Sequence, residues 1–336
     1  MGSLESRLAM QETCECYFMI ANWHALTTRA EDTAGIRRDT IEIVRDWLAV
    51  GIDPKKATLF VQSEVPAIAE LTWYFAMLLG YGRLMQNPTL KDEIVVKGKA
   101  ESYSFGFLMY PVGQIADILA FRPSFVPVGV DQVPHIEMTR EIAARFNLLY
   151  CSGDEVAGNL EKKLKRMKLE EAVGVFPIPE ARIGRVARLT GTDGKNKMSK
   201  SLNNAIFLSD DADTVRKKCN KIFTGRATMD TPPVIEGNTV LEYHEHFNAD
   251  RARVAKLREE YTAGRIGDGQ LKGELAEALN AFLDPIRTRR AGISDADVIA
   301  ALKTGTAKAN ETAEETLWLA KKAARFDFFR RTITLR

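Results

Sequence analysis

Short apolar runs alternate with helical patterns along the chain as far as Asp131. The runs are short enough for buried strands of a parallel sheet, and they are CYFMIA at 16–21, ATLFVQS at 57–63 and FVPVGV at 125–130. Helical spacing of apolar residues marks 3–13, 33–50, 66–79 and a segment that opens with MYPVGQIADILAF at 109–121. This alternation predicts a Rossmann-like, doubly wound parallel α/β sheet, with ligands beyond the carboxyl ends of the strands.

The pattern changes after Asn204, where strand signals fade and charged helical segments dominate. We therefore predict an α/β catalytic domain over 1–203 and an all-helical domain over 204–336, whose last helix is available to pack back on the first domain. The loop TMDTPPVIEGNT at 228–239 is the clearest break in the helical region.

Composition excludes several classes of protein. With 47 basic and 45 acidic residues in 336, the net charge of +2 gives no strong global field, so nucleic-acid contacts must rely on local basic clusters. Cys14, Cys16, Cys151 and Cys219 lack metal-ligand spacing, and we predict neither a metal site nor disulfides. The chain start lacks a signal-peptide pattern, and charge interrupts the longer apolar stretches. We expect a cytoplasmic protein without a membrane span.

The strongest local signal is the loop GTDGKNKMSKSLNNAI at 191–206. It presents the run Lys197, Met198, Ser199, Lys200 and Ser201, in which mobile cations can neutralise charge that develops on a polyphosphate. A solvated basic turn is the more frequent explanation for a lysine-rich loop taken alone.

A second signal lies where the third apolar run ends. Gly129 is followed by Asp131, Gln132 and His135 at the opening of a helix, where a carboxylate and an amide can bind ribose or an amine. Taken singly, Asp131 is at least as well explained as a helix cap, and His135 as a helix residue with an ordinary hydrogen bond.

Asp117 is the third signal, because it interrupts an otherwise apolar helical segment. A carboxylate in such a place needs a donor, and an indole N–H is one candidate; a neighbouring side chain is an equal alternative. His24 follows the first apolar run and is placed to line the same crevice, although a lone histidine is more often structural.

Taken together, these segments resemble a class I aminoacyl-tRNA synthetase, because KMSKS occurs downstream of a strand-terminal GVDQ in the order that this family requires. The resemblance covers nearly the whole chain. Five segments favour the tryptophanyl branch over the tyrosyl one: WHALTT, FVQSEVPAIAELTW, YPVGQIADIL, PVGVDQVPHIEMTREIAARFN and GDGQLKGELAEALNAFLDPIRTRRA.

The resemblance implies specific roles. Asp117 would accept the indole N–H of tryptophan, and the other tryptophan-binding residues would be His24, Tyr110, Val126, Val128 and Gln132. ATP would be bound by Gly129, Asp131, Lys197, Met198, Ser199, Lys200 and Ser201, of which Lys197, Lys200 and Ser201 would be catalytic. The implied substrates and partners are L-tryptophan, ATP with Mg²⁺, tRNA(Trp) and a second copy in a homodimer.

The chain departs from the family pattern at its start. The family opens with a strand and a HIGH-type ATP-binding motif, whereas this sequence aligns best from the following helix, so we expect a missing segment of roughly 15–20 residues. Asn22 and the pair Gln114-Ile115 also differ from the usual family residues.

Two alternatives remain open. One is a truncated, catalytically impaired tRNA-binding paralogue, for which the basic residues Lys217, Lys218, Lys221, Arg287, Arg289 and Arg290 would supply phosphate contacts. The other is a tyrosine–tRNA ligase, which would need hydrogen-bonding groups for a phenol deep in its pocket.

Overall fold

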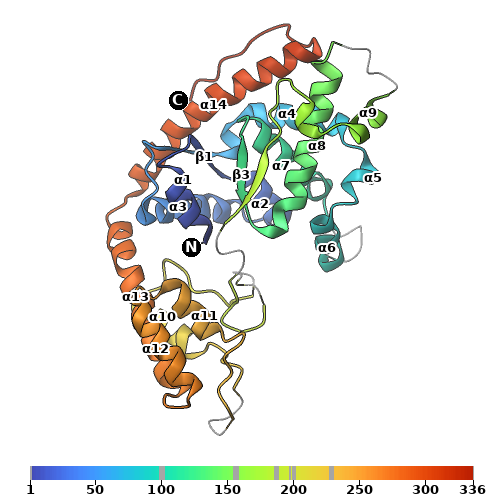
Figure 1. Ribbon diagram of the computed structural model, residues 1–336. Coiled ribbons are helices and arrows are strands. Elements are labelled where there is room, and N and C mark those ends of the chain that lie inside the picture. The colour runs from blue at the N-terminus through green and yellow to red at the C-terminus, as the bar shows by residue number, and fades with distance from the viewer. Residues whose placement is uncertain are drawn as a thin grey trace. The chain divides into compact units, whose positions relative to one another are not determined.

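Four short strands form two parallel pairs. The computed structural model describes residues 2–97, 103–153, 159–184, 189–196, 198, 202–226 and 231–335. In it β1 (Cys16–Ile20) pairs with β2 (Ala57–Val61), and β3 (Phe125–Val128) pairs with β4 (Glu180–Ile183), as Figure 1 shows. The two pairs are separate sheets among the described residues. The first three strands confirm the predicted runs. The fourth was not predicted, because the sequence EARI is largely exposed and lacks an apolar run.

Helices connect and surround these strands. Those of the first part of the chain are α1 (Gly2–Met10), α2 (Asn22–Arg29), α3 (Thr33–Val50), α4 (Pro66–Leu78), α5 (Tyr81–Leu84), α6 (Pro88–Lys97), α7 (Phe105–Leu119), α8 (Val133–Tyr150) and α9 (Leu160–Arg166). Those that follow are α10 (Ala212–Asn220), α11 (Thr239–Phe247), α12 (Arg251–Thr262), α13 (Asp268–Ala291) and α14 (Asp295–Ala324). The predicted helices at 3–13, 33–50 and 66–79 are confirmed. No helix in the described part of the chain is long and apolar enough to cross a membrane.

The helix predicted to open at 109–121 begins earlier than expected. Ser104 caps α7, since its hydroxyl accepts a hydrogen bond from the Phe107 N–H at 3.2 Å, and Pro111 therefore lies inside the helix rather than at its start. α7 carries Tyr110 and Asp117. The start of the helix at Ser104 therefore sets the positions of both side chains along it.

Both faces of the β1–β2 pair are covered. Because successive side chains of a strand point to opposite faces, Phe18 of β1 faces α3, where its ring lies 6.3 Å from that of Trp47. The neighbouring Tyr17 and Met19 pack against a large core cluster that includes side chains of α4, α7, α8 and α14. This arrangement agrees with the doubly wound architecture that the sequence pattern predicts.

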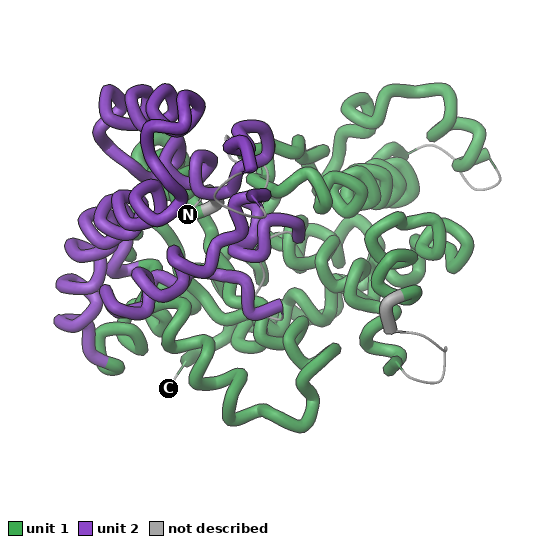
Figure 2. The backbone as a smooth tube through the Cα atoms, turned by 90° about the horizontal axis from the view of Figure 1, so that it is seen from below, with its two compact units in different colours: residues 1–47, 51–187, 295–336 green, residues 48–50, 188–294 purple. Residues whose placement is uncertain are grey.

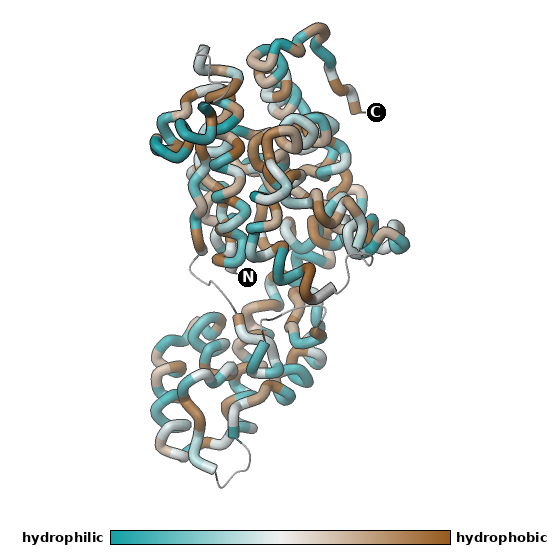
Figure 3. The backbone as a smooth tube through the Cα atoms, turned by 90° about the vertical axis from the view of Figure 1, so that its right-hand side faces the viewer, coloured by the Kyte–Doolittle hydropathy of each residue, from teal (hydrophilic) through white to brown (hydrophobic). Residues whose placement is uncertain are grey.

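The long helix α14 packs directly on β2 through small side chains. Figure 3 shows hydrophilic and hydrophobic residues mixed along the coils of the chain. The buried side of α14 includes Gly305, Ala309 and Ala313. Asn310 adds a hydrogen bond from its amide nitrogen to the Glu64 carbonyl oxygen at 2.8 Å. The contact is closest at Gly305, where an added Cβ would lie 2.0 Å from the backbone oxygen of Leu59.

Substitution of Gly305 by alanine should therefore destabilise the fold strongly. The methyl group would meet strand backbone, which cannot rotate away, so the helix must shift; overpacking of this kind costs about 1–3 kcal/mol. Thermal and urea denaturation should show the loss. Gly273→Ala is the matched control, because a Cβ there meets nothing within 4 Å; equal stability of the two variants would contradict the close contact.

The chain divides into two compact units, coloured separately in Figure 2. Unit 1 comprises 1–47, 51–187 and 295–336, and unit 2 comprises 48–50 and 188–294. The change of unit near residue 187 precedes the boundary expected at 203, and α14 groups with unit 1. The break expected at 228–239 begins outside the described residues; from 231 to 238 the chain forms neither helix nor strand.

Candidate active site

A cavity of about 730 Å³ lies in unit 1, at the carboxyl ends of β1, β2 and β3. Ala21 and Trp23 follow β1, Gln62 follows β2 and Gln132 follows β3, and all four line the cavity; α4, α7 and α8 complete its wall. This is the edge at which open α/β sheets bind their ligands. Four of the residues that the sequence analysis selected meet here: His24, Tyr110, Asp117 and Gln132.

Asp117 lines the cavity, and its carboxylate is otherwise surrounded by protein. The Gln62 amide nitrogen donates to both of its oxygens, at 2.7 and 2.9 Å. Burial raises the pKa of Asp117 to about 7, and the hydrogen bond from Gln62 opposes this shift. The site therefore holds a carboxylate that is poised between its two protonation states near neutral pH and can accept a hydrogen bond from a ligand.

Aromatic rings line the neighbouring wall. The rings of His24 and Tyr110 meet edge to face with centroids 4.9 Å apart, and those of Tyr110 and His135 lie 5.6 Å apart. Burial, reinforced by His24, lowers the pKa of His135 to about 4, so this imidazole is neutral at pH 7. Burial also raises the pKa of Tyr110 above its usual range, which keeps the phenol protonated.

The tautomer of His135 follows from its partner, Asn87. The Asn87 side-chain oxygen accepts hydrogen bonds from the backbone N–H groups of Thr89 and Leu90 at the start of α6, which leaves the amide nitrogen 3.3 Å from His135 Nδ1. Because that nitrogen can only donate, Nδ1 must accept and the proton of neutral His135 lies on Nε2. Nε2 is buried and has no hydrogen-bond partner among the described residues. It is an N–H donor buried within the wall of the cavity, which His135 lines.

The turn after β3 contributes Gln132 to the lining of the cavity. Gln114 donates to the Gln132 side-chain oxygen at 3.2 Å, and Gln132 donates to the Asp131 carboxylate at the same distance. A Cβ at Gly129 would lie 2.7 Å from that carboxylate, so a side chain at this position would displace the Asp131 carboxylate. Asp131 and Gly129 do not line the cavity, and neither do Val126 and Val128, which are half-buried on β3.

The lysine-rich loop belongs to unit 2. Lys197, Ser199, Lys200 and Ser201 lie outside the described residues; of the KMSKS run only Met198 is described, and its N–H donates to the Leu189 carbonyl at 2.9 Å. The turn before it is built around Asp193, which accepts hydrogen bonds from the backbone of Lys195 and from the side chains of Asn196 and Asn204. These donors hold the pKa of Asp193 far below its usual range.

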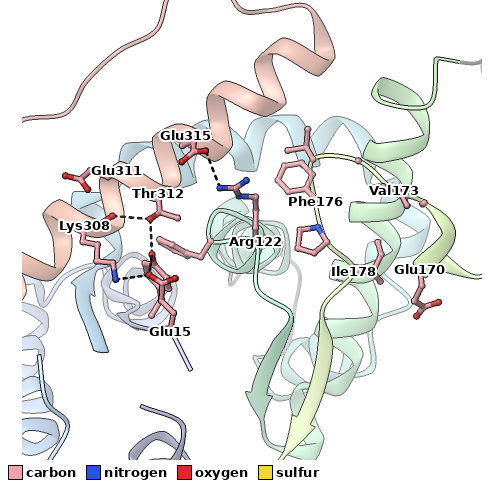
Figure 4. A pocket seen from close by; sticks show the side chains of 16 residues that line it. Glu15, Arg122, Glu170, Val173, Phe176, Ile178, Lys308, Glu311, Thr312 and Glu315 are labelled. Atoms are coloured by element: carbon pink, nitrogen blue, oxygen red, sulfur yellow. Dashed lines mark hydrogen bonds and ion pairs between the residues drawn. The ribbon is translucent and has the colours of Figure 1, made fainter. Parts of the chain in front are cut away.

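A second cavity, of about 670 Å³, lies at the amino ends of the strands (Figure 4). Its principal charges neutralise one another. Lys308 Nζ lies 2.8 Å from the Glu15 carboxylate, and Arg122 lies 3.7 Å from Glu315. This edge is not where sheets of this kind bind ligands, and we assign the active site to the first cavity.

Comparison with known proteins decides the family. The family model of tRNA synthetases class I (W and Y) matches residues 1–284. This chain belongs to that family. The tryptophan–tRNA ligase of Treponema pallidum is 44% identical over 332 residues, which cover 96% of this chain and 90% of the relative. That of Streptococcus mutans is 42% identical and covers 98% and 94%.

A solved structure supports the same assignment for this class I synthetase. The tryptophanyl-tRNA synthetase of Campylobacter jejuni, determined as a complex with ADP and tryptophan, superposes with a TM-score of 0.80 at 28% identity, covering 96% of this chain and 94% of that one. The predicted fold class, a Rossmann-like α/β unit with a helical region, is thereby confirmed for this synthetase.

One synthetase site residue escaped the sequence analysis. Gln62 was assigned only to a strand, because the run FVQS is apolar apart from its end. Its position directly after a buried strand was the available signal, since polar residues there face the ligand edge of the sheet.

Proposed function

We propose that this protein is a tryptophan–tRNA ligase, which activates L-tryptophan with ATP and transfers it to tRNA(Trp) in the cytoplasm. The buried, cavity-facing carboxylate of Asp117 carries the proposal, because an indole N–H is the donor that distinguishes tryptophan from the other apolar amino acids. The relatives of high coverage with this activity support it.

The cavity suits both ends of tryptophan. Asp117 accepts the indole N–H, and the apolar side chains of Met19, Ile68 and Met109, which line the cavity, pack against the ring. Val126 and Val128 do not line the cavity, and we assign them no contact with the ring. The ammonium group of tryptophan is attracted by Gln132 and Glu93, which also line the cavity. The neutral imidazole of His135 and the paired rings of His24 and Tyr110 line the same cavity.

In the first reaction a carboxylate oxygen of tryptophan attacks the α-phosphorus of ATP. The bond from that phosphorus to the bridging oxygen breaks, and pyrophosphate leaves with the electron pair. Gly129 and Asp131 hold the ribose side, and Lys197, Met198, Ser199, Lys200 and Ser201 hold the phosphates, with Mg²⁺ entering as part of the ATP substrate. The residues act by positioning and by stabilising charge.

In the second reaction a ribose hydroxyl of the terminal tRNA adenosine attacks the acyl carbon of the adenylate, and AMP leaves. The helical unit is our candidate for tRNA recognition. Several of its basic residues support the fold itself, since Lys218 pairs with Asp210 at 2.6 Å and Arg289 donates to the Ala49 carbonyl. Lys217 and Lys221 are exposed and remain available for phosphate contacts.

The homodimer is part of the same proposal. Trp73 and Met77 lie one turn apart on α4 with 64% and 73% of their surface exposed, and a partner that covers both side chains would remove this apolar surface from water. A second copy of the chain is the partner that family membership suggests.

Exchange of radiolabelled pyrophosphate into ATP tests the activity. We expect exchange that depends on tryptophan and is weaker with tyrosine by about 10-fold or more, because the smaller phenol ring leaves part of the cavity unfilled and places its O–H elsewhere than the indole N–H. Comparable exchange with tyrosine would contradict the proposal and favour a tyrosine–tRNA ligase. Tight tRNA binding with neither amino acid active would favour the impaired paralogue.

A further inference from the structure

Gln62 joins two parts of the cavity that the chain keeps far apart in sequence. Its side chain is 5% exposed, and both ends of its amide are occupied. The nitrogen donates to the two oxygens of Asp117 on α7. The oxygen accepts from the backbone N–H groups of Trp23 and His24, at 3.1 and 3.4 Å.

The bonds to Trp23 and His24 replace a missing helix cap. Ala21 occupies the N-cap position of α2 and has no side-chain acceptor. Helices normally satisfy their first N–H groups with a local Ser, Thr, Asp or Asn. Gln62 supplies the acceptor from the end of β2 instead. It therefore fixes the start of the helix that carries His24, whose ring packs on Tyr110.

The bonds to Asp117 favour the ionised form of the carboxylate against the effect of its burial. A buried carboxylate without a donor takes up a proton, because burial favours the neutral form. Gln62 is the side chain that opposes this effect at Asp117. Only an amide serves both purposes here: a carboxylate at this position would repel Asp117, a methionine would offer neither donor nor acceptor, and an asparagine is one methylene shorter.

We propose that Gln62 is a positioning residue for amino-acid selection: it orients Asp117 towards the indole N–H and favours its ionised form, and it holds α2 in register with it. The inference rests on the proposed function. It predicts that removal of the amide weakens tryptophan binding through Asp117 and not through a general loss of structure.

The test is the dissociation constant of L-tryptophan, measured by calorimetry from pH 6 to pH 9 on the whole chain and on two variants. Gln62→Met should weaken binding about 10-fold or more at pH 7, and the pH below which affinity falls should move upwards, because Asp117 then protonates more readily. Gln62→Glu should bind worst at high pH and recover as pH falls, since a protonated glutamic acid can again donate to Asp117.

Other ionisable side chains line the cavity, namely His24, Glu93, Tyr110 and His135, so the pH effect needs an internal check. In an Asp117→Asn background, Gln62→Met should produce no further shift of the pH profile. Gln86→Met, on the exposed surface, is the matched control and should bind as the unchanged chain does. Thermal denaturation identifies any variant that fails to fold.

The outcomes separate the inference from the proposed function. If the unchanged chain binds no tryptophan, or binds tyrosine equally well, the proposed function is wrong. If the unchanged chain binds tryptophan, yet folded Gln62→Met and Gln62→Glu keep its affinity and pH profile, Gln62 has no positioning role. Opposite pH trends in the two variants would support the role.

Discussion

Asp117→Asn is expected to lower kcat/KM for tryptophan by about 10- to 150-fold, which corresponds to the 1.5–3 kcal/mol typical of a hydrogen bond to a charged group. The carboxylate offers two oxygens, one of which can face the indole while Gln62 holds both. Asparagine offers only one oxygen, so the amide nitrogen must face either Gln62 or the indole, donor against donor. Pyrophosphate exchange at saturating ATP measures the change.

The same residue should make tryptophan binding depend on pH. The pKa of Asp117 is raised to about 7 by burial, and the ionised form is the stronger acceptor. The KM for tryptophan should therefore rise as pH falls through about 7 and level off above it, and this dependence should be lost in Asp117→Asn. Asp327→Asn, at an exposed position, is the control. An unchanged KM in Asp117→Asn would show that the indole N–H is read elsewhere.

Lys200→Ala is expected to reduce kcat for tryptophan activation by about 100- to 1000-fold, the usual cost of removing one preorganised group that stabilises developing charge. The negative charge on the leaving pyrophosphate grows only as the bond to the α-phosphorus breaks. The lysine therefore contributes more to the transition state than to the bound substrates, and the KM for tryptophan should change little.

A lysine in the same loop provides the comparison for Lys200. Lys195→Ala removes an exposed cation but leaves the KMSKS run intact, and should retain most of the activity. If both variants lose activity equally, the loop acts through its total charge and not through a particular lysine. If Lys200→Ala keeps full activity, the family role does not apply to this chain.

The sequence analysis succeeded where one local pattern decides the structure. The strand at 16–21 was recognised because an apolar run of this length suits a buried parallel strand, and the helix at 33–50 because its apolar positions have helical spacing and Gly51 follows, where φ is +117°. Asp117 was recognised because a carboxylate among apolar helix residues needs a partner. The pattern left that partner open, and the structure contains a neighbouring side chain, Gln62, with room for a ligand beside it.

Features set by contacts between distant segments could not be predicted. The tautomer of His135 depends on Asn87, whose oxygen is committed to the start of α6. The acceptor for the first N–H groups of α2 comes from Gln62. Neither the Gln62 contact nor the Asn87 contact changes the local spacing of apolar residues, so the sequence pattern does not reveal them. The sequence analysis allowed the last helix to pack back on the first domain, but it could not locate the close contact at Gly305, where α14 approaches the backbone of β2.

The central claim is that this cavity binds tryptophan by its indole N–H. Calorimetric titration of the whole chain with L-tryptophan, L-tyrosine and 1-methyl-L-tryptophan, which lacks that N–H, tests it most directly. We predict saturable binding of L-tryptophan at one site per chain, with both other ligands weaker by about 10-fold or more. Equal binding of L-tryptophan and its 1-methyl derivative, or preferential binding of tyrosine, would contradict the claim.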